Sequence, residues 1–135
     1  MGNSSIRMWK TYNVFPDLKV INHGFGRSHI SDVNFYYKEV ILKYKHALIV
    51  FCYGDNDVVV NKSVRQAFED YKNLVDKIEN DIPNSKFIFI SVKPSAQRMD
   101  YWEYMLILNE KIKTYNKLKA SLFNVDLDHT FTQFK

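Results

Sequence analysis

The sequence predicts an α/β fold in three layers (αβα), in which a parallel sheet lies between two layers of helices. Short apolar runs alternate along the chain with longer segments of helical spacing, and this alternation is typical of right-handed βαβ units. Each apolar run is followed by a polar segment, as expected where parallel strands end at a shared edge. With 135 residues the chain is long enough for one domain, residues 1–135.

Four apolar runs are the predicted strands. The run Ala-Leu-Ile-Val-Phe-Cys-Tyr is almost continuously apolar, which indicates a strand that is buried on both faces. In chain order the predicted strands are Leu18–Asn22, Ala47–Tyr53, Lys86–Ser91 and Leu122–Asp126.

Between the strands, apolar residues recur at the spacing of one helix face, which predicts amphipathic helices. The predicted helices are Ser31–Lys43, Ser63–Asn80 and Asp100–Leu118, with a shorter helical stretch through Ile6, Met8 and Trp9. The apolar stripe of the first long helix is Val33, Tyr36, Tyr37, Val40 and Ile41. Ser28 or Ser31 is the expected N-cap of that helix, and Ser63 is the expected N-cap of the next. Pro83 follows the second long helix as a stop signal.

The composition argues against several other classes of protein. The net charge of +4 is small and no run of like charges occurs, so no nucleic-acid partner is expected. Cys52 is the only cysteine, so it forms no internal disulfide and is expected to be a small buried residue. No apolar stretch reaches the roughly 20 residues that span a bilayer, so no membrane partner is expected. The N-terminus lacks the apolar core of a signal peptide, which predicts a cytoplasmic protein unless a shortened N-terminus has lost an export signal.

Polar segments follow all four predicted strands, and they would share one edge of the sheet. They are Asn22–His29, Gly54–Asp57, Lys93–Ser95 and Asp126–His129. The opening Gly2-Asn3-Ser4-Ser5 suits a fifth loop of this kind. One edge would therefore gather a serine, an asparagine, backbone N–H groups near glycines, and a histidine close to aspartates. Acyl transfer needs these groups as a nucleophile, oxyanion donors, a base and a carboxylate that orients the base.

At three of these segments the chain resembles the SGNH/GDSL hydrolases. Gly2-Asn3-Ser4 is similar to the family's first block, Gly-Asp-Ser, with Asn3 in place of the aspartate. Asn22–Ile30 resembles the second block, and Gly54-Asp55-Asn56-Asp57 fits the third, Gly-x-Asn-Asp. The resemblance runs from Gly2 to about Asp126, and it implies a flavodoxin-like parallel sheet and a serine esterase.

The resemblance also implies a role for each residue of the site. Ser4 would be the nucleophile, His129 the base and Asp126 the carboxylate that orients the base. The side chain of Asn56 and the backbone N–H groups near Gly26 and Arg27 would hold the oxyanion. The implied substrate is a small ester of the acetyl type, and the implied reaction needs no cofactor and no metal ion.

Three features depart from the family's pattern. Arg27 aligns with a glycine of the family's oxyanion hole, where a positive φ would strain an arginine. Asp126–His129 has the Asp-x-x-His spacing of the family's last block but follows the last strand directly. It is therefore either a shortened form of that block or a segment from which the true block is lost. Gly2 almost coincides with the start of the chain, so the strand that should deliver Ser4 is absent. The framework thus resembles a family member truncated at both ends.

These departures favour a second hypothesis, in which the chain is a catalytically inactive remnant or a binding and assembly module of the same fold. Exposed strand edges would then allow self-association, because an unpaired edge accepts a strand from another chain. Ser4 could instead cap the first helix, and Asn56 could be an ordinary turn residue. A flavodoxin-like nucleotide-binding domain is a third hypothesis, but Asn22–His29 is a poor match to the glycine-rich phosphate loop G-x-G-x-x-G.

Overall fold

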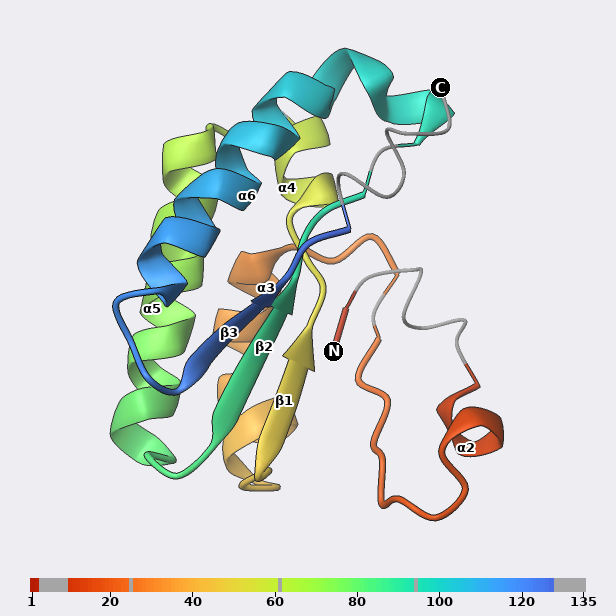
Figure 1. Cartoon of the computed structure of the whole chain (residues 1–135), viewed down its shortest axis with the longest axis vertical. Coiled ribbons are helices and arrows are strands. Elements are labelled where there is room, and N and C mark those ends of the chain that lie inside the picture. The colour runs from red at the N-terminus through yellow and green to blue at the C-terminus, as the bar shows by residue number, and fades with distance from the viewer. Residues whose placement is uncertain (3–9, 25, 61, 94, 128–135) are drawn as a thin grey trace.

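The computed structural model describes residues 1–2, 10–24, 26–60, 62–93 and 95–127 of the chain (Figure 1). The strands are β1 (Leu48–Phe51), β2 (Lys86–Ile90) and β3 (Leu122–Val125). The α-helices are α2 (Thr11–Val14), α3 (Ile30–Phe35), α4 (Asp55–Val59), α5 (Val64–Asp81) and α6 (Trp102–Asn116). A π-helical turn, η1 (Lys38–Leu42), follows α3, and a 3₁₀ turn, η2 (Ala96–Tyr101), leads into α6.

The three strands form one parallel sheet in the order β1-β2-β3. Ile49 is paired with Phe87, and Phe87 is paired in turn with Leu122, so apolar side chains line up across one face of the sheet. The chain passes from each strand to the next through helices, as βαβ units require. The α/β class and three of the four predicted strands are therefore confirmed.

The predicted strand Leu18–Asn22 is wrong, because no strand forms there. The first β-bridge of this part of the chain is made by Gly24, and its partner is Gly2. Leu18, Val20 and Ile21 are exposed. A parallel strand needs a neighbour of similar length to satisfy its backbone groups. Among the described residues the neighbour at this position is only the short segment 1–2, so the apolar run has no partner along its length.

Met1 and Gly2 lie beside the end of β1, on the side away from β2. Gly2 forms parallel bridges to both Gly24 and Cys52. The amino nitrogen of Met1 donates to the backbone oxygen of Val50 at 2.7 Å, and the N–H of Cys52 donates to the oxygen of Met1 at 3.0 Å. The order across the sheet is therefore Gly24, Gly2, β1, β2 and β3. Chain order reverses beside Gly2, and such a reversal marks the ligand crevice of open parallel sheets.

The two long helices agree with the sequence prediction. The side-chain oxygen of Ser63 accepts a hydrogen bond from the backbone N–H of Gln66 at 3.0 Å, so Ser63 is the N-cap of α5. This helix ends at Asp81, shortly before Pro83. The α6 helix occupies residues within the predicted Asp100–Leu118.

The first predicted long helix is interrupted. The α3 helix ends at Phe35, Tyr36 adopts φ −95° and ψ 19°, and the π-helical turn η1 follows. The wider turn places Tyr37, Val40 and Ile41 in the core, whereas Tyr36 is 51% exposed. The predicted stripe included Tyr36 because it assumed a regular period of 3.6 residues, and the π turn shifts that period.

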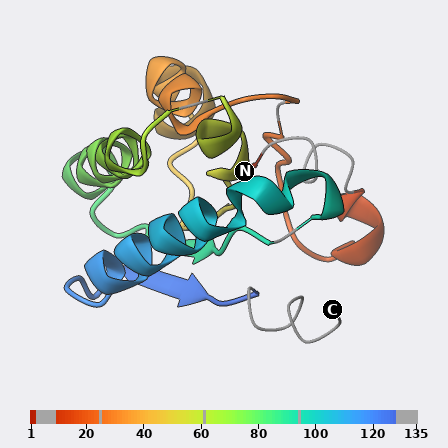
Figure 2. The same ribbon diagram turned by 90° about the horizontal axis from the view of Figure 1, so that it is seen from above.

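One face of the sheet packs against helices, and this face holds most of the core. The strand residues buried there are Ile49, Phe51, Phe87, Phe89 and Leu122. They form one apolar cluster with α3, α5 and α6, which lie side by side on this face (Figure 2). On the opposite face Leu48, Phe123 and Val125 are 43% to 51% exposed. The described residues thus account for two of the three predicted layers.

None of the described helices is both long enough and apolar enough to cross a bilayer. Cys52 is a free cysteine and is partly buried at the end of β1. Burial raises the pKa of its thiol, so the neutral form predominates at neutral pH.

Candidate active site

Three chain segments meet at the carboxyl edge of the sheet, beside the point where strand order reverses. Gly2 lies there between Gly24 and Cys52. The polar segments identified from the sequence continue from these three residues: Ser4 follows Gly2, the loop 26–28 follows Gly24, and Gly54–Asp57 follows Cys52. The topology therefore brings the beginnings of all three segments together, as the pattern of strands predicts.

Gly54 allows the chain to turn from β1 into α4. It has a φ of 125°, a conformation that residues with a side chain rarely adopt. A β-carbon at this position would lie 3.0 Å from Leu108 Cδ2 and 3.0 Å from Val92 Cγ2. The turn therefore packs closely against α6 and the end of β2, and this close packing fixes the position of the first turn of α4.

Asn56 joins the first turn of α4 to the loop that follows Gly24. The residue is 8% exposed, and its Nδ2 donates to the backbone oxygen of Ser28 at 3.0 Å. Its Oδ1 accepts a hydrogen bond from Nη1 of Arg98 at 3.0 Å. One N–H of the amide is thus used by Ser28, and the other has no partner among the described residues. An unused N–H donor in such a place can stabilise a developing oxyanion.

Arg27 has a φ of 60°, the left-handed conformation that would strain an arginine at this position. The left-handed conformation costs a residue with a side chain about 1–2 kcal/mol. Gly26 and Arg27 are exposed, whereas the next residue, Ser28, is buried and accepts the hydrogen bond from Asn56. The strained residue therefore lies directly beside the contact that holds the two loops together.

The side chain of Ser28 is anchored in the core. Its hydroxyl donates to the hydroxyl oxygen of Tyr53 at 3.2 Å. Burial raises the pKa of Tyr53 to about 12, and the hydrogen bond from Ser28 opposes that shift. The predicted N-cap role of Ser28 is wrong, because its side chain faces Tyr53 rather than the start of α3.

His29 is the N-cap residue of α3. Its backbone N–H donates to Oδ2 of Asp32 at 2.7 Å, so the carboxylate of the first turn closes the helix start. The alternative cap, Ser31, is also wrong, because it lies inside the helix. The structure thus places His29, rather than Ser28 or Ser31, at the N-cap position of α3.

Asp57 is a buried carboxylate, and its burial cannot be predicted from the Gly-x-Asn-Asp pattern. It is 0% exposed and accepts hydrogen bonds from the backbone N–H of Ile30 at 3.2 Å and from Nζ of Lys62 at 3.3 Å. Burial raises the pKa of Asp57, and the positive charge of Lys62 opposes the shift. Lys62 also forms an ion pair with Asp70 at 3.0 Å. These contacts fasten the start of α3 to α4 and to α5.

Asp126 lies directly after β3. Its Oδ2 accepts a hydrogen bond from Nζ of Lys113 at 2.6 Å. The next residue, Leu127, donates its N–H to the hydroxyl oxygen of Ser91 at 2.7 Å, which holds the end of β3 against the end of β2. Within the described part of the chain, no hydrogen bond or ion pair joins Asp126 to Asn56. Among the described residues, the Asp126 carboxylate accepts hydrogen bonds from Lys113 of α6 and from Asn124 of β3 instead.

The expected nucleophile and base lie outside the described residues. Ser4 falls within residues 3–9, and His129 falls within residues 128–135. The catalytic roles of Ser4, His129 and Asp126, and the oxyanion roles of Asn56, Gly26 and Arg27, therefore stay predictions.

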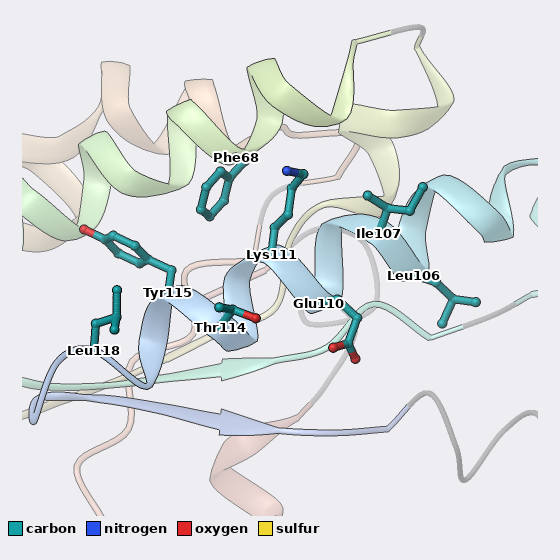
Figure 3. Close-up of a pocket in the computed structure, with 8 residues that line it drawn as sticks. All are labelled: Phe68, Leu106, Ile107, Glu110, Lys111, Thr114, Tyr115 and Leu118. Carbon is teal, nitrogen blue, oxygen red and sulfur yellow. The ribbon is translucent and has the colours of Figure 1, made fainter.

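Two hollows on the surface differ in their chemistry. A polar hollow beside the candidate site is lined by His29, Ser31, Asp32, Val60, Lys62, Ser63 and Gln66. An apolar hollow lies over α5 and α6 (Figure 3), lined by Phe68, Leu106, Ile107, Glu110, Lys111, Thr114, Tyr115 and Leu118. The apolar hollow contains none of the residues that follow the strands, so it is separate from the candidate active site. In the described ranges, no group of three or more His, Cys, Asp or Glu side chains is placed to hold a metal ion.

Solved structures resemble this chain, although no family model and no curated protein matches its sequence. A protein from Streptococcus pneumonia, named after platelet activating factor, has a TM-score of 0.83 and 15% identity over 95% of this chain and 64% of its own. A GDSL-like lipase from Bacteroides thetaiotaomicron has a TM-score of 0.80 and 21% identity over 93% of this chain and 65% of its own. A catalytic mutant of Axe2, an acetylxylan esterase from Geobacillus stearothermophilus, has a TM-score of 0.75 and 17% identity over 91% of this chain and 61% of its own.

A parallel sheet with reversed strand order and a polar carboxyl edge defines a class of open α/β domains that bind ligands at that edge. Within this class, the chain has the fold of the GDSL-type hydrolases. It spans 61% to 65% of the length of these three structures. Because the identity is 15% to 21%, the likeness shows the fold rather than the activity.

Proposed function

We propose that this protein is a serine hydrolase of the SGNH/GDSL type that cleaves small carboxylic esters, with acetyl esters as the substrate class. The observation that carries the proposal is the placement of Asn56. Its amide is fixed at the carboxyl edge of the sheet with one N–H that no described residue accepts, and Gly2, two positions before Ser4, lies at the same edge. A nucleophile and an oxyanion donor on one edge are the minimum that acyl transfer requires.

In the proposed reaction, Ser4 Oγ attacks the carbonyl carbon of the ester while His129 takes the serine proton. The carbonyl oxygen becomes an oxyanion, held by Asn56 Nδ2 and by backbone N–H groups at Gly26 and Arg27. His129 then protonates the departing alkoxide, which leaves an acyl group on Ser4. A water molecule, deprotonated by His129, attacks the carbonyl carbon of this acyl-serine. His129 then returns the proton to Ser4 Oγ as the bond to Ser4 breaks and the carboxylic acid is released.

The names of the Axe2 structures support the choice of residues and of substrate class. The catalytic mutants of that acetylxylan esterase replace a serine, an aspartate and a histidine, and the aspartate and histidine are three positions apart. Asp126 and His129 have the same spacing in this chain. Oδ2 of Asp126 accepts from Lys113 at 2.6 Å, and Oδ1 accepts a longer hydrogen bond, 3.4 Å, from Nδ2 of Asn124. Oδ1 has the weaker partner, so it is the atom that would accept the hydrogen bond from His129.

The test is the hydrolysis of p-nitrophenyl acetate by the wild-type protein and by three variants. We expect Ser4→Ala and His129→Ala each to lower kcat/KM by about 10³-fold or more. Asn56→Ala should lower kcat by about 10²- to 10³-fold, as removal of one oxyanion donor does in other hydrolases. Asn80→Ala, a change at an exposed asparagine of α5, is the matched control and should leave the rate unchanged. Equal rates for the wild type, Ser4→Ala and His129→Ala would contradict the mechanism.

A second candidate function is a non-catalytic binding or assembly module of the same fold. The short ion pair between Asp126 and Lys113, 2.6 Å long, favours it, because a carboxylate already neutralised by a lysine orients a histidine less strongly. The partly open sheet face with Phe123 and Val125 would then accept a partner or a second copy. Sedimentation of a concentration-dependent dimer, together with no ester turnover, would favour this function over the first.

A further inference from the structure

Arg98 reaches from the segment after β2 to the first turn of α4. Its Nη1 donates to Oδ1 of Asn56 at 3.0 Å and to Oδ2 of Asp55 at 2.9 Å. Its backbone, with φ −124° and ψ 19°, departs from the helical conformation inside η2. One nitrogen atom therefore connects two consecutive residues of the Gly-x-Asn-Asp segment.

The partners of Asn56 fix which way its amide faces. A guanidinium group can only donate hydrogen bonds, so the amide oxygen must face Arg98. The backbone oxygen of Ser28 can only accept, so the amide nitrogen must face Ser28. If the amide were rotated by 180°, its nitrogen would face the Arg98 donor and its oxygen would face the backbone oxygen of Ser28, so both hydrogen bonds would be lost. The second N–H of Asn56, for which the described part of the chain offers no acceptor, is consequently held in one direction.

The charge on Arg98 has a second effect on the amide. A cation at the amide oxygen draws electron density away from the nitrogen, and this polarisation strengthens the N–H groups as donors. The ion pair with Asp55 holds the guanidinium in place although the Arg98 side chain is 34% exposed. The effect is therefore transmitted through Asn56 and needs no contact between Arg98 and a substrate.

We infer that Arg98 is a positioning residue for the oxyanion donor: it sets the orientation of the Asn56 amide and strengthens the N–H that has no partner among the described residues. The part of this inference that concerns the oxyanion rests on the proposed function. The dependence of the amide on Arg98 can be measured without any ester, so the two can fail separately.

The kinetic test compares Arg98→Met, which removes the guanidinium and keeps an apolar stem, with Arg65→Met on the exposed side of α5. With p-nitrophenyl acetate, Arg98→Met should lower kcat about tenfold or more and change KM by less than about twofold. Arg98→Lys should recover part of the loss, because it restores the charge but not the rigid fork. Arg65→Met should match the wild type. A change in KM alone, or no change in kcat, would overturn the inference.

A double-mutant cycle separates a role through Asn56 from a general structural role. In the Asn56→Ala background, Arg98→Met should cause no further loss of kcat, because the amide through which Arg98 acts is gone. A further tenfold loss in that background would show that Arg98 acts by another route and would overturn the inference.

The ester-independent test is the side-chain amide spectrum of ¹⁵N-labelled protein, in which the Asn56 signals are identified by their loss in Asn56→Ala. In the wild type the two Nδ2 protons should be well separated in chemical shift, because one is hydrogen-bonded to the backbone oxygen of Ser28 and the other is not. In Arg98→Met, and to a smaller degree in Arg98→Lys, they should move toward the values of the exposed Asn80. If the signals respond while the wild type hydrolyses no ester, the proposed function fails and the positioning of Asn56 stands. If the wild type is active and the signals do not respond, the inference alone fails.

Discussion

At the scale of single residues, Gly54 sets the geometry of the site most directly. Replacing it with alanine would add a side chain at φ 125° and a β-carbon 3.0 Å from two side chains of the core. We expect Gly54→Ala to lower the free energy of unfolding by about 2–4 kcal/mol, from backbone strain and overpacking together. Urea denaturation followed by circular dichroism measures the change. Gly26→Ala, at an exposed glycine, is the control, and an equally small loss for both variants would contradict the packing described for Gly54.

Arg27 offers the opposite change, because its left-handed backbone suits glycine better than arginine. We expect Arg27→Gly to raise the free energy of unfolding by about 0.5–1 kcal/mol, since relief of strain exceeds the entropy that glycine adds to the unfolded chain. Lys45→Gly, at φ 47°, should behave in the same way. Lys43→Gly, at φ −55°, should destabilise the protein instead. Thermal denaturation that showed the same loss for all three variants would contradict this account.

The sequence predicts some residues of the candidate site and not others. Asn56 and Arg27 are predictable because they occupy fixed places in motifs that follow apolar runs. Arg98 is not, because it reaches Asn56 from another loop, three positions beyond the Lys93–Ser95 segment that the sequence singles out. The burial of Asp57 is likewise a tertiary property, which depends on how α3 and α4 pack.

At the scale of elements, the side chain of Asn109 in α6 forms two hydrogen bonds with the backbone of the chain that follows β2. Its Oδ1 accepts from the N–H of Val92 at 2.8 Å, and its Nδ2 donates to the oxygen of Val92 at 3.0 Å. We expect Asn109→Ala to cost about 2–4 kcal/mol, because two buried backbone groups lose their partners. It should also lower ester turnover per folded molecule, since the segment carrying Arg98 is released.

The control for Asn109 is Asn116, which is also buried in α6 and accepts a hydrogen bond from the hydroxyl of Tyr71 at 2.8 Å. Asn116→Ala should lose stability to a similar degree but keep the turnover of the folded fraction. Stability from urea denaturation and turnover at low temperature give both quantities. Equal losses of turnover in the two variants would show that the hydrogen bonds between Asn109 and Val92 do not position the site.

Elements were predictable where their sequence pattern and their neighbours agree. The run at 47–53 became β1 because β2 lies along it. The run at 18–22, which is less apolar because it contains Lys19 and Asn22, has no comparable neighbour among the described residues and forms no strand. Its apolar residues alone do not predict this outcome, because a strand also depends on its partner. The π turn after α3 was not predicted for a related reason. Tyr37 is buried in the core and Tyr36 is exposed, and the periodicity of the sequence does not distinguish the two residues.

At the scale of the whole molecule, buried tyrosines predict a loss of stability in alkali. Burial raises the pKa of Tyr53 to about 12 and also raises the pKa of Tyr71, whereas an unfolded tyrosine titrates near its ordinary value of about 10. The folded protein therefore holds these protons after the unfolded chain has released them, so stability falls as the pH rises above about 10. Each tyrosine contributes up to about 1.4 kcal/mol per pH unit.

Urea denaturation at pH 9 and at pH 11 tests the alkaline prediction. Tyr53→Phe should lose less stability between these pH values than the wild type does. Tyr104→Phe, at a tyrosine that is 53% exposed, should behave like the wild type. The same free energy of unfolding at both pH values would contradict the burial of the tyrosines.

The sequence predicts where the loops of the molecule meet better than it predicts which side chains pair with one another. Alternation of apolar runs and helical segments predicts that polar loops meet at one edge, and Gly2, Gly24 and Cys52 do meet there. The partner of Asp126 was not predictable, because Lys113 comes from a different element. Which groups complete a catalytic set around Asn56 depends on such long-range pairings, and these are a property of packing.

The central claim is that Ser4 acts as a nucleophile beside Asn56, and covalent labelling tests it most directly. Treatment with a fluorophosphonate, followed by intact-mass and peptide analysis, should give one adduct, on Ser4. The adduct should form at least about tenfold more slowly in Asn56→Ala, because the oxygen of the probe is no longer held by the amide. Absence of an adduct, or an adduct on another residue that forms equally fast in both proteins, would contradict the account.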